Sequence, residues 1–115
     1  MQVHRIFYSL VMMVALAAVL AWPATAADEP TFRIEFNNGK ITPNRIEVPA
    51  KTRIRLELVN VGDSPAEFES VELRKEKVLA PKSETVMVIR TLDPGEYAFF
   101  DDFHLDHPPA LVVAK

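Results

Sequence analysis

Residues 95–104 read Gly-Glu-Tyr-Ala-Phe-Phe-Asp-Asp-Phe-His and carry the clearest information about both fold and site. Their first part alternates as a β-strand does, with Tyr97, Phe99 and Asp101 on one face. The carboxylate of Asp101 therefore shares a face with two aromatic side chains of the kind that a core buries. An ionised carboxylate there needs a cation or several hydrogen-bond donors. The stretch therefore predicts a strand that ends in a polar site, with a metal ion as the first candidate ligand.

Short strand-like segments lie on the N-terminal side of this stretch and beyond it. The clearest has Ile54, Leu56 and Leu58 alternating with charged residues, as in a half-buried strand. Further strands are expected over residues 31–36, 46–48, 67–70, 78–79, 85–89, 97–101 and 111–113. The charged run over residues 72–77 is expected to be a solvated connection or a single helical turn. About seven or eight short strands with turns between them predict an all-β fold, an antiparallel Greek-key sandwich or barrel.

The first 26 residues have the pattern of an export signal. A basic start precedes an apolar run over residues 6–20, and Ala24-Thr25-Ala26 forms an A-x-A cleavage site. The alternative is a membrane anchor, but small residues and Pro23 end the run near the minimum length of roughly 20 residues for a span. We therefore expect a signal peptide over residues 1–26, one domain over residues 27–115, and a periplasmic location.

Composition excludes several classes of function. The net charge is −3 and no basic stripe is present, which argues against a nucleic-acid partner. The chain has no cysteine, so a disulfide and a thiolate metal ligand are both impossible. Three glycines and no phosphate-loop motif leave little support for nucleotide chemistry.

The sequence after residue 26 resembles the cupredoxin fold. Residues 41–50, Ile-Thr-Pro-Asn-Arg-Ile-Glu-Val-Pro-Ala, look like the opening strand pair of that family. Residues 60–68 look like the loop that carries its first histidine, and residues 95–100 like the strand that delivers its cysteine. His104 falls where the second histidine is expected. The resemblance implies a cupredoxin-like sandwich with a metal site at one end.

The departures from that family concern the metal ligands. A blue-copper site uses two histidines and a cysteine, with a weak methionine nearby. Here Asp101 stands in the cysteine position, and residues 106–109 contain no thioether. The first histidine position falls on Ala66 or, with the register shifted by one, on Glu67. The sequence therefore does not predict a blue-copper protein.

Three segments are similar to a narrower group, the cupredoxin-like periplasmic proteins that accompany bacterial ferrous-iron permeases. They are residues 67–70, 73–77 and 99–104. This resemblance implies that the chain binds a copper or iron ion, supports iron uptake, and works with other components of a membrane iron-uptake system. It also implies help with ferrous-iron oxidation or with delivery to a permease, and enzymatic turnover is left open.

Two arrangements of metal ligands are compatible with the sequence. In the first, Glu67, Asp101 and His104 converge at one end of the sandwich as primary ligands, with Glu69 and Asp102 as auxiliary ligands. In the second, an inward-pointing side chain at position 68 turns Glu67 and Glu69 outward, where Asp102 joins them. Carboxylates suit ferric iron, and an imidazole widens the range to copper(II), zinc or ferrous iron.

Each of these residues also has a simpler interpretation. Glu67 and Glu69 can be solvated edge-strand charges that prevent aggregation. Asp101 and Asp102 can cap a turn, and His104 can be an ordinary loop histidine. On that interpretation the sandwich has lost its metal site. The alternative function is then a non-metal interaction module whose acidic patch docks a basic surface on another exported protein.

Overall fold

The computed structural model describes residues 29–115, and the expected signal peptide lies outside them. The described part is all-β, with no helix long and apolar enough to cross a membrane. Its nine strands are β1 (Thr31–Asn37), β2 (Lys40–Thr42), β3 (Arg45–Val48), β4 (Ile54–Asn60), β5 (Ala66–Ser70), β6 (Lys75–Leu79), β7 (Ser83–Ile89), β8 (Gly95–Asp101) and β9 (Ala110–Ala114).

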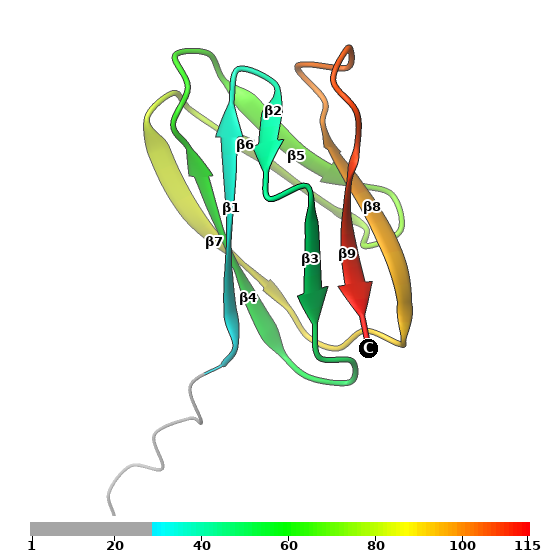
Figure 1. Ribbon diagram of the computed structural model, residues 1–115. Coiled ribbons are helices and arrows are strands. Elements are labelled where there is room, and N and C mark those ends of the chain that lie inside the picture. The colour runs from blue at the N-terminus through cyan, green and yellow to red at the C-terminus, as the bar shows by residue number, and fades with distance from the viewer. Residues whose placement is uncertain (1–28) are drawn as a thin grey trace, which may run out of the picture.

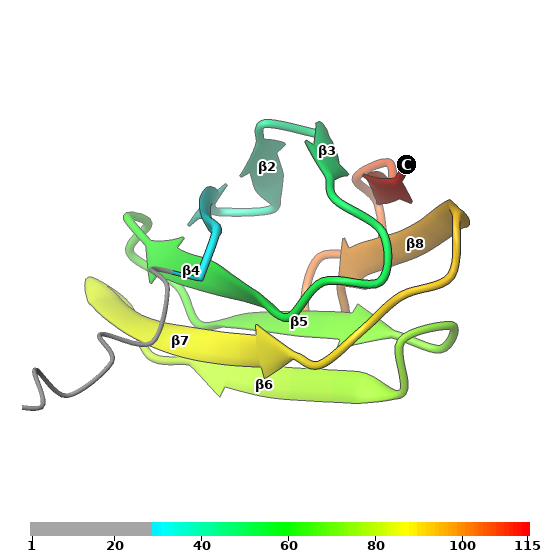
Figure 2. The ribbon, with the colours of Figure 1, turned by 90° about the horizontal axis from the view of Figure 1, so that it is seen from below.

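The strands form two sheets packed face to face (Figure 1). One sheet has the order β2-β1-β4-β7 and the other β3-β9-β8-β5-β6, so the chain crosses between layers several times. β1 and β4 pair in parallel, as do β3 and β9, while the other neighbours are antiparallel. In Figure 2 the two sheets approach each other along β6 and β7, which lie side by side. The predicted all-β sandwich is confirmed, with two mixed sheets in place of purely antiparallel ones.

The core lies between the sheets and is built largely by alternation along the strands, although the C-terminal halves of β4 and β9 have consecutive buried residues. Ile54, Leu56 and Leu58 of β4 are fully buried, as the sequence pattern predicts. From the other sheet, Phe68 and Phe99 are also fully buried, and their rings stack with centroids 4.9 Å apart. Burying each such side chain contributes about 1.5–3 kcal/mol. This core fixes the direction in which every β5 and β8 side chain points.

Two loops meet at one end of the sandwich. The β1–β2 turn places Asn38 and Gly39 at positive φ, +48° and +98°. A Cβ atom on Gly39 would lie 2.6 Å from the His107 Nε2 atom and 2.9 Å from the His104 Cβ atom. Only a glycine therefore lets this turn pack against the loop between β8 and β9.

Asn60 anchors the loop between β4 and β5. It is 1% exposed, and its Nδ2 atom donates to the carbonyl oxygens of Ser64, Leu79 and Ala80 at 2.9, 3.2 and 3.1 Å. Its Oδ1 atom accepts from the Gly62 N–H at 3.0 Å. These bonds hold the loop in the position from which β5 starts, so the side chains at the start of β5 have a defined direction.

The prediction for residues 72–77 was wrong in its second half. From Lys75 the chain forms β6, which pairs with β5 so that Glu69 lies opposite Glu76 and Phe68 opposite Lys77. β6 is the edge strand of its sheet, and four of its five residues are exposed. Charged side chains are favourable on such an edge because they discourage pairing with other chains. The charged residues 75–77, which the sequence suggested to be part of a connection, therefore belong to an edge strand.

Candidate functional site

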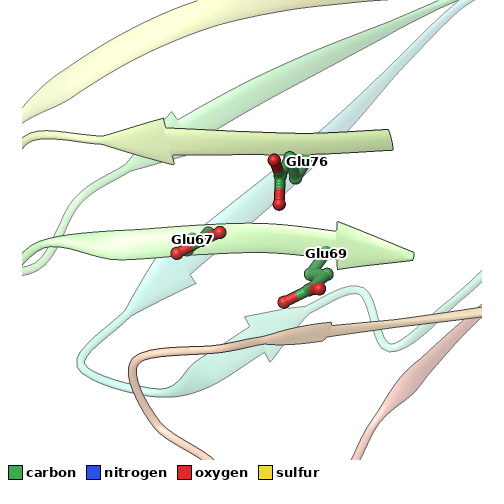
Figure 3. Close-up of side chains that lie close together, drawn as sticks. All are labelled: Glu67, Glu69 and Glu76. Carbon is green, nitrogen blue, oxygen red and sulfur yellow. The ribbon is translucent and has the colours of Figure 1, made fainter. Parts of the chain in front are cut away.

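Four carboxylates gather on the outer face of β5, β6 and the end of β8; we call them the acidic cluster, and they are Glu67, Glu69, Glu76 and Asp102. Because Phe68 points into the core, Glu67 and Glu69 lie half-buried on the opposite face. The antiparallel pairing of β5 with β6 sets Glu76 opposite Glu69. Figure 3 shows the three glutamates on these neighbouring strands.

The geometry of the acidic cluster is compatible with a shared ligand. Glu67, Glu69 and Glu76 each offer a carboxylate oxygen, and these three atoms lie within 4.8 Å of one another. They are the one such group of three or more potential metal ligands within residues 29–115. Asp102 is held next to them because its N–H donates to the Glu67 carbonyl at 2.9 Å.

The pKa values of two members of the acidic cluster, Glu67 and Glu69, lie above the ordinary glutamate value. Partial burial raises the pKa of Glu67, and repulsion from Asp102, Glu76 and Asp101 raises it further. Partial burial also raises the pKa of Glu69, followed by repulsion from and hydrogen bonding with Asp102 and repulsion from Glu67 and Glu76. In the part of the chain that the structure describes, no Lys, Arg or His forms an ion pair with any of the four.

Asp101 lies on the other face of β8, and its environment is the opposite. Its side chain is 1% exposed. One carboxylate oxygen, Oδ1, accepts from the N–H groups of Glu67 and Phe103, both at 3.0 Å. The other, Oδ2, lies 2.8 Å from the His104 Nδ1 atom. Three donors therefore compensate the buried charge, as a buried carboxylate requires.

The hydrogen bonds continue from Asp101 into two other loops. The His104 Nε2 atom lies 3.1 Å from the Ser64 hydroxyl oxygen, which in turn lies 2.9 Å from the Asn38 Oδ1 atom. That amide oxygen also accepts from the N–H groups of Asp63 and Ser64, at 3.1 and 3.2 Å. We call Asp101, His104, Ser64 and Asn38 the loop-end network.

The structure therefore separates residues that the first predicted arrangement joins. Ala66 is buried and Glu67 points outward, so the inward position near Asp101 carries no ligand atom. Glu67 does not share a group of potential ligands with Asp101 and His104 among the described residues. Glu67 and Glu69 do come together with Asp102 nearby, as in the second arrangement. The role of all five residues as metal ligands stays a prediction.

Sequence reasoning missed three members of these groups. Glu76 joins the acidic cluster only through the register of β5 with β6. The run Lys75-Glu76-Lys77 is charged throughout, so it carries no apolar alternation that identifies a strand. Ser64 and Asn38 enter the loop-end network through contacts between loops that no local pattern reveals.

Comparison with known proteins settles the family. The family described as a cupredoxin-like domain matches residues 10–114. The chain belongs to the cupredoxin-like family. It is also 37% identical over 83 residues to an uncharacterized protein of Rickettsia prowazekii (strain Madrid E), a match that covers 72% of this chain. The same match covers 66% of that relative, just under two thirds of its length.

Solved structures support the cupredoxin-like fold. A dithionite-reduced auracyanin from Roseiflexus castenholzii matches with a TM-score of 0.63 and 12% identity, over 76% of this chain and 98% of that one. A purple cupredoxin from Nitrosopumilus maritimus matches with a TM-score of 0.56 and 18% identity, over 72% and 98%. The metal-binding domain of a Cu(I)-exporting ATPase from Streptococcus pneumoniae D39, solved with Cu(I), matches with a TM-score of 0.62 and 13% identity, over 74% and 84%.

The thiolate copper centre typical of blue cupredoxins does not fit the residues of this cupredoxin-like chain. It requires a cysteine, and the chain has none. At the corresponding end of the sandwich, both carboxylate oxygens of Asp101 and both ring nitrogens of His104 already have polar partners in the protein. The acidic cluster, in contrast, offers several oxygens without a cationic partner. Oxygen donors of this kind suit hard metal ions.

Proposed function

We propose that this cupredoxin-like protein is exported to the periplasm, binds an iron or copper ion through the acidic cluster, and supports iron uptake. The observation that carries the proposal is the convergence of three glutamate oxygens within 4.8 Å of one another. Partial burial and then repulsion from neighbouring carboxylates raise the pKa values of Glu67 and Glu69, and no cationic side chain within residues 29–115 forms an ion pair with them. A bound cation would remove the repulsion between these carboxylates. Binding would therefore be favoured, because the ligand atoms already lie close together before the ion arrives.

The donor type favours ferric iron within this proposal. An all-oxygen set is harder than the imidazole and thiolate sets that select copper, and hard donors prefer the trivalent state of iron. A site that binds ferric more tightly than ferrous iron makes oxidation of ferrous iron more favourable. The protein would then assist the oxidation of ferrous iron by a separate electron acceptor such as dioxygen, or hand an ion to a membrane permease. The signal-like segment over residues 1–26 and the resemblance to proteins of ferrous-iron permease systems support this assignment.

Metal uptake measured on matched variants tests the proposal. Purified protein is dialysed against ferrous iron under anaerobic conditions, ferric nitrilotriacetate or copper(II), and its metal content and unfolding free energy are measured. Binding at about 100 times Kd raises the unfolding free energy by about 2.7 kcal/mol. We expect Asp102→Ala and Glu69→Gln to lower uptake. Glu57→Gln is the control, because Glu57 lies on β4 in the other sheet and pairs with Arg33.

Asp101 distinguishes the two predicted arrangements of ligands. If the ion lies in the acidic cluster, Asp101→Asn retains uptake and Asp102→Ala loses it. If uptake instead depends on Asp101 and His104, the ion lies at the loop end and the acidic-cluster site is wrong. Absence of uptake with all three metal solutions contradicts metal binding altogether.

The alternative function is a non-metal interaction module. Val78 is 56% exposed on β6 and lies opposite Glu67, so one exposed apolar side chain adjoins the acidic cluster. In that case the acidic face docks a basic surface of another exported protein. Such a protein shows neither metal uptake nor a metal-dependent change in stability.

A further inference from the structure

Three side chains of the loop-end network have the order carboxylate, imidazole, hydroxyl. The Asp101 Oδ2 atom lies 2.8 Å from the His104 Nδ1 atom, and the His104 Nε2 atom lies 3.1 Å from the Ser64 Oγ atom. A proton on Nδ1 donated to Asp101 leaves Nε2 free to accept one. This is the relation between an orienting acid, a general base and a nucleophile in acyl-transfer enzymes.

The orienting contacts are rigid, whereas the hydroxyl is accessible. The Asp101 side chain is 1% exposed, and two backbone N–H groups fix its second oxygen. Ser64 is only partly buried, and the His104 side chain is 20% exposed. Phe103 and Leu105, at 49% and 70% exposure, flank His104 in sequence, so exposed apolar side chains adjoin the histidine. Ser64 and His104 are thus not sealed inside the core.

Two backbone donors converge beside the hydroxyl. The N–H groups of Asp63 and Ser64 both point at one oxygen, the Asn38 Oδ1 atom, at 3.1 and 3.2 Å. Paired N–H groups that meet at one point beside a nucleophile are what stabilises the oxyanion of a tetrahedral intermediate. In this structure the Asn38 amide oxygen occupies that point.

Asn38 also competes for the hydroxyl proton. The Ser64 Oγ atom lies 2.9 Å from the Asn38 Oδ1 atom and 3.1 Å from the His104 Nε2 atom, yet it has a single hydrogen to donate. When that hydrogen goes to Asn38, His104 cannot act as its base. One side chain thus fills the oxyanion position and diverts the nucleophile.

The geometry points to a latent Ser–His–Asp acyl-transfer site in which Ser64 is the nucleophile, His104 the general base and Asp101 a positioning residue, and in which Asn38 makes the reaction slow without abolishing it. The substrate class is a small ester. Ser64 Oγ forms a bond to the acyl carbon while its proton moves to His104 Nε2. Collapse of the intermediate breaks the bond to the leaving oxygen, which takes that proton. Water then repeats both steps, releasing the carboxylic acid and restoring Ser64.

This inference is independent of the proposed metal site, because no side chain of the acidic cluster takes part in it; Glu67 contributes only its backbone N–H. All reactions are therefore run with EDTA, so that a metal-bound hydroxide is not a source of hydrolysis. The probes are an alkyl fluorophosphonate, whose phosphorus forms a bond to a reactive serine oxygen with loss of fluoride, and p-nitrophenyl acetate. Peptide mass spectrometry locates the labelled serine in the purified full-length chain.

Variants at the three positions decide the matter. Asn38→Gly removes the amide while suiting the +48° φ at this position, and we expect labelling of Ser64 to become about tenfold to a hundredfold faster. In the Asn38→Gly background, His104→Gln should slow labelling by about a hundredfold. Ser64→Ala should abolish it in both backgrounds.

Ser83→Ala is the matched control, because the Ser83 hydroxyl donates to the Ala80 carbonyl at 2.6 Å and takes no part in the network. It should label as the wild type does, and thermal melts confirm that each variant is folded. If Asn38→Gly does not fold, the wild type still provides the test. Its total labelling rate must then exceed that of Ser64→Ala, and the excess label must be on Ser64. Labelling spread over other serines, or equal rates in wild type and Ser64→Ala, overturns the inference.

Discussion

The carboxylates on the two faces of β5 and β8 differ in burial and in the number of hydrogen-bond donors around them. On the inner face, the Asp101 side chain is 1% exposed, yet two backbone N–H groups and the His104 ring compensate its charge. On the outer face, Glu67 and Glu69 are only half-buried, yet they face other carboxylates, which helps to raise their pKa values. Partial burial raises the pKa values of Glu67 and Glu69 most, and neighbouring carboxylates raise them further. Asp101 is more deeply buried but has three compensating donors, which the two glutamates lack.

This difference divides the described chain into a region whose polar groups are satisfied within the protein and a region whose carboxylates lack cationic partners. Within residues 29–115, every buried side-chain nitrogen or oxygen has a hydrogen-bond partner, including those of Asp101 and Asn60. The acidic cluster lies where partners are missing at the surface. Removing a carboxylate should thus be costly on the inner face and harmless or stabilising on the outer face.

The largest expected effect is that of Asp101→Ala. This change leaves the N–H groups of Glu67 and Phe103 and the Nδ1 atom of His104 without their acceptor. Each buried donor left without its acceptor costs about 1–3 kcal/mol, and three are affected, which urea unfolding measures as a lower midpoint. Asp102→Ala is the neighbouring control and should not destabilise the protein. Equal losses in the two variants would contradict the division between the faces.

Asn60→Ala is expected to have the next largest effect. It removes a buried amide that donates to three carbonyl oxygens and accepts from the Gly62 N–H. Groups left unsatisfied in this way cost about 1–3 kcal/mol, and urea unfolding again provides the measurement. Asn44→Ala, at an exposed asparagine, is the control. A loss no larger than that of the control would show that the β4–β5 loop is held by other contacts.

The sequence carried enough information for the sandwich and for half of the site. Alternation of Ile54, Leu56 and Leu58 with charged residues predicts β4. Because side chains of a strand alternate between its two faces, only one face of this segment is apolar and can pack on the core. Asp101 and His104 are close in sequence at the end of a strand, so their contact follows from local geometry. The buried Phe68 likewise implies that Glu67 and Glu69 point outward, which is the second predicted arrangement.

The missing parts depend on contacts between distant segments. Ser64 meets His104 across 40 residues and Asn38 across 26 residues, and both contacts depend on how the loops pack. Glu76 enters the acidic cluster through a strand register that the sequence does not specify, since β6 is an edge strand with almost no buried residue. Strand pairing is weakly encoded where no face is buried. Local patterns could not supply these three residues.

A smaller effect should come from neutralising the acidic cluster, and it depends on pH. Well below the ordinary glutamate pKa of 4.5, folded and unfolded states are both protonated, so the repulsion is absent. As pH rises through 4.5, the unfolded state loses its protons first, because the folded-state pKa values of Glu67 and Glu69 are raised. The metal-free protein is therefore expected to lose stability until the pH has passed those raised values.

The variant that tests this is the double change Glu67→Gln and Glu69→Gln. Without metal, its melting temperature should exceed that of the wild type by roughly 1–4 °C at pH 7, and the two should coincide near pH 3. The same double change made with Glu35 and Glu57 is the control, since both pair with Arg33. A double variant that is less stable at pH 7 would show that these glutamates make favourable contacts in the metal-free state.

The smallest expected effect is that of Arg33→Ala, on the outer face of the other sheet. There Arg33 lies 3.1 Å from Glu35 and 3.0 Å from Glu57, so this face supplies the cation that the acidic cluster lacks. All three side chains are more than a third exposed, and water screens such pairs. Arg33→Ala should therefore change the melting temperature by less than roughly 2 °C, as calorimetry can measure. A larger fall would mean that carboxylates without a cationic partner lower stability even when they are well exposed. The repulsion within the metal-free acidic cluster would then lower stability by more than the partial burial of Glu67 and Glu69 implies.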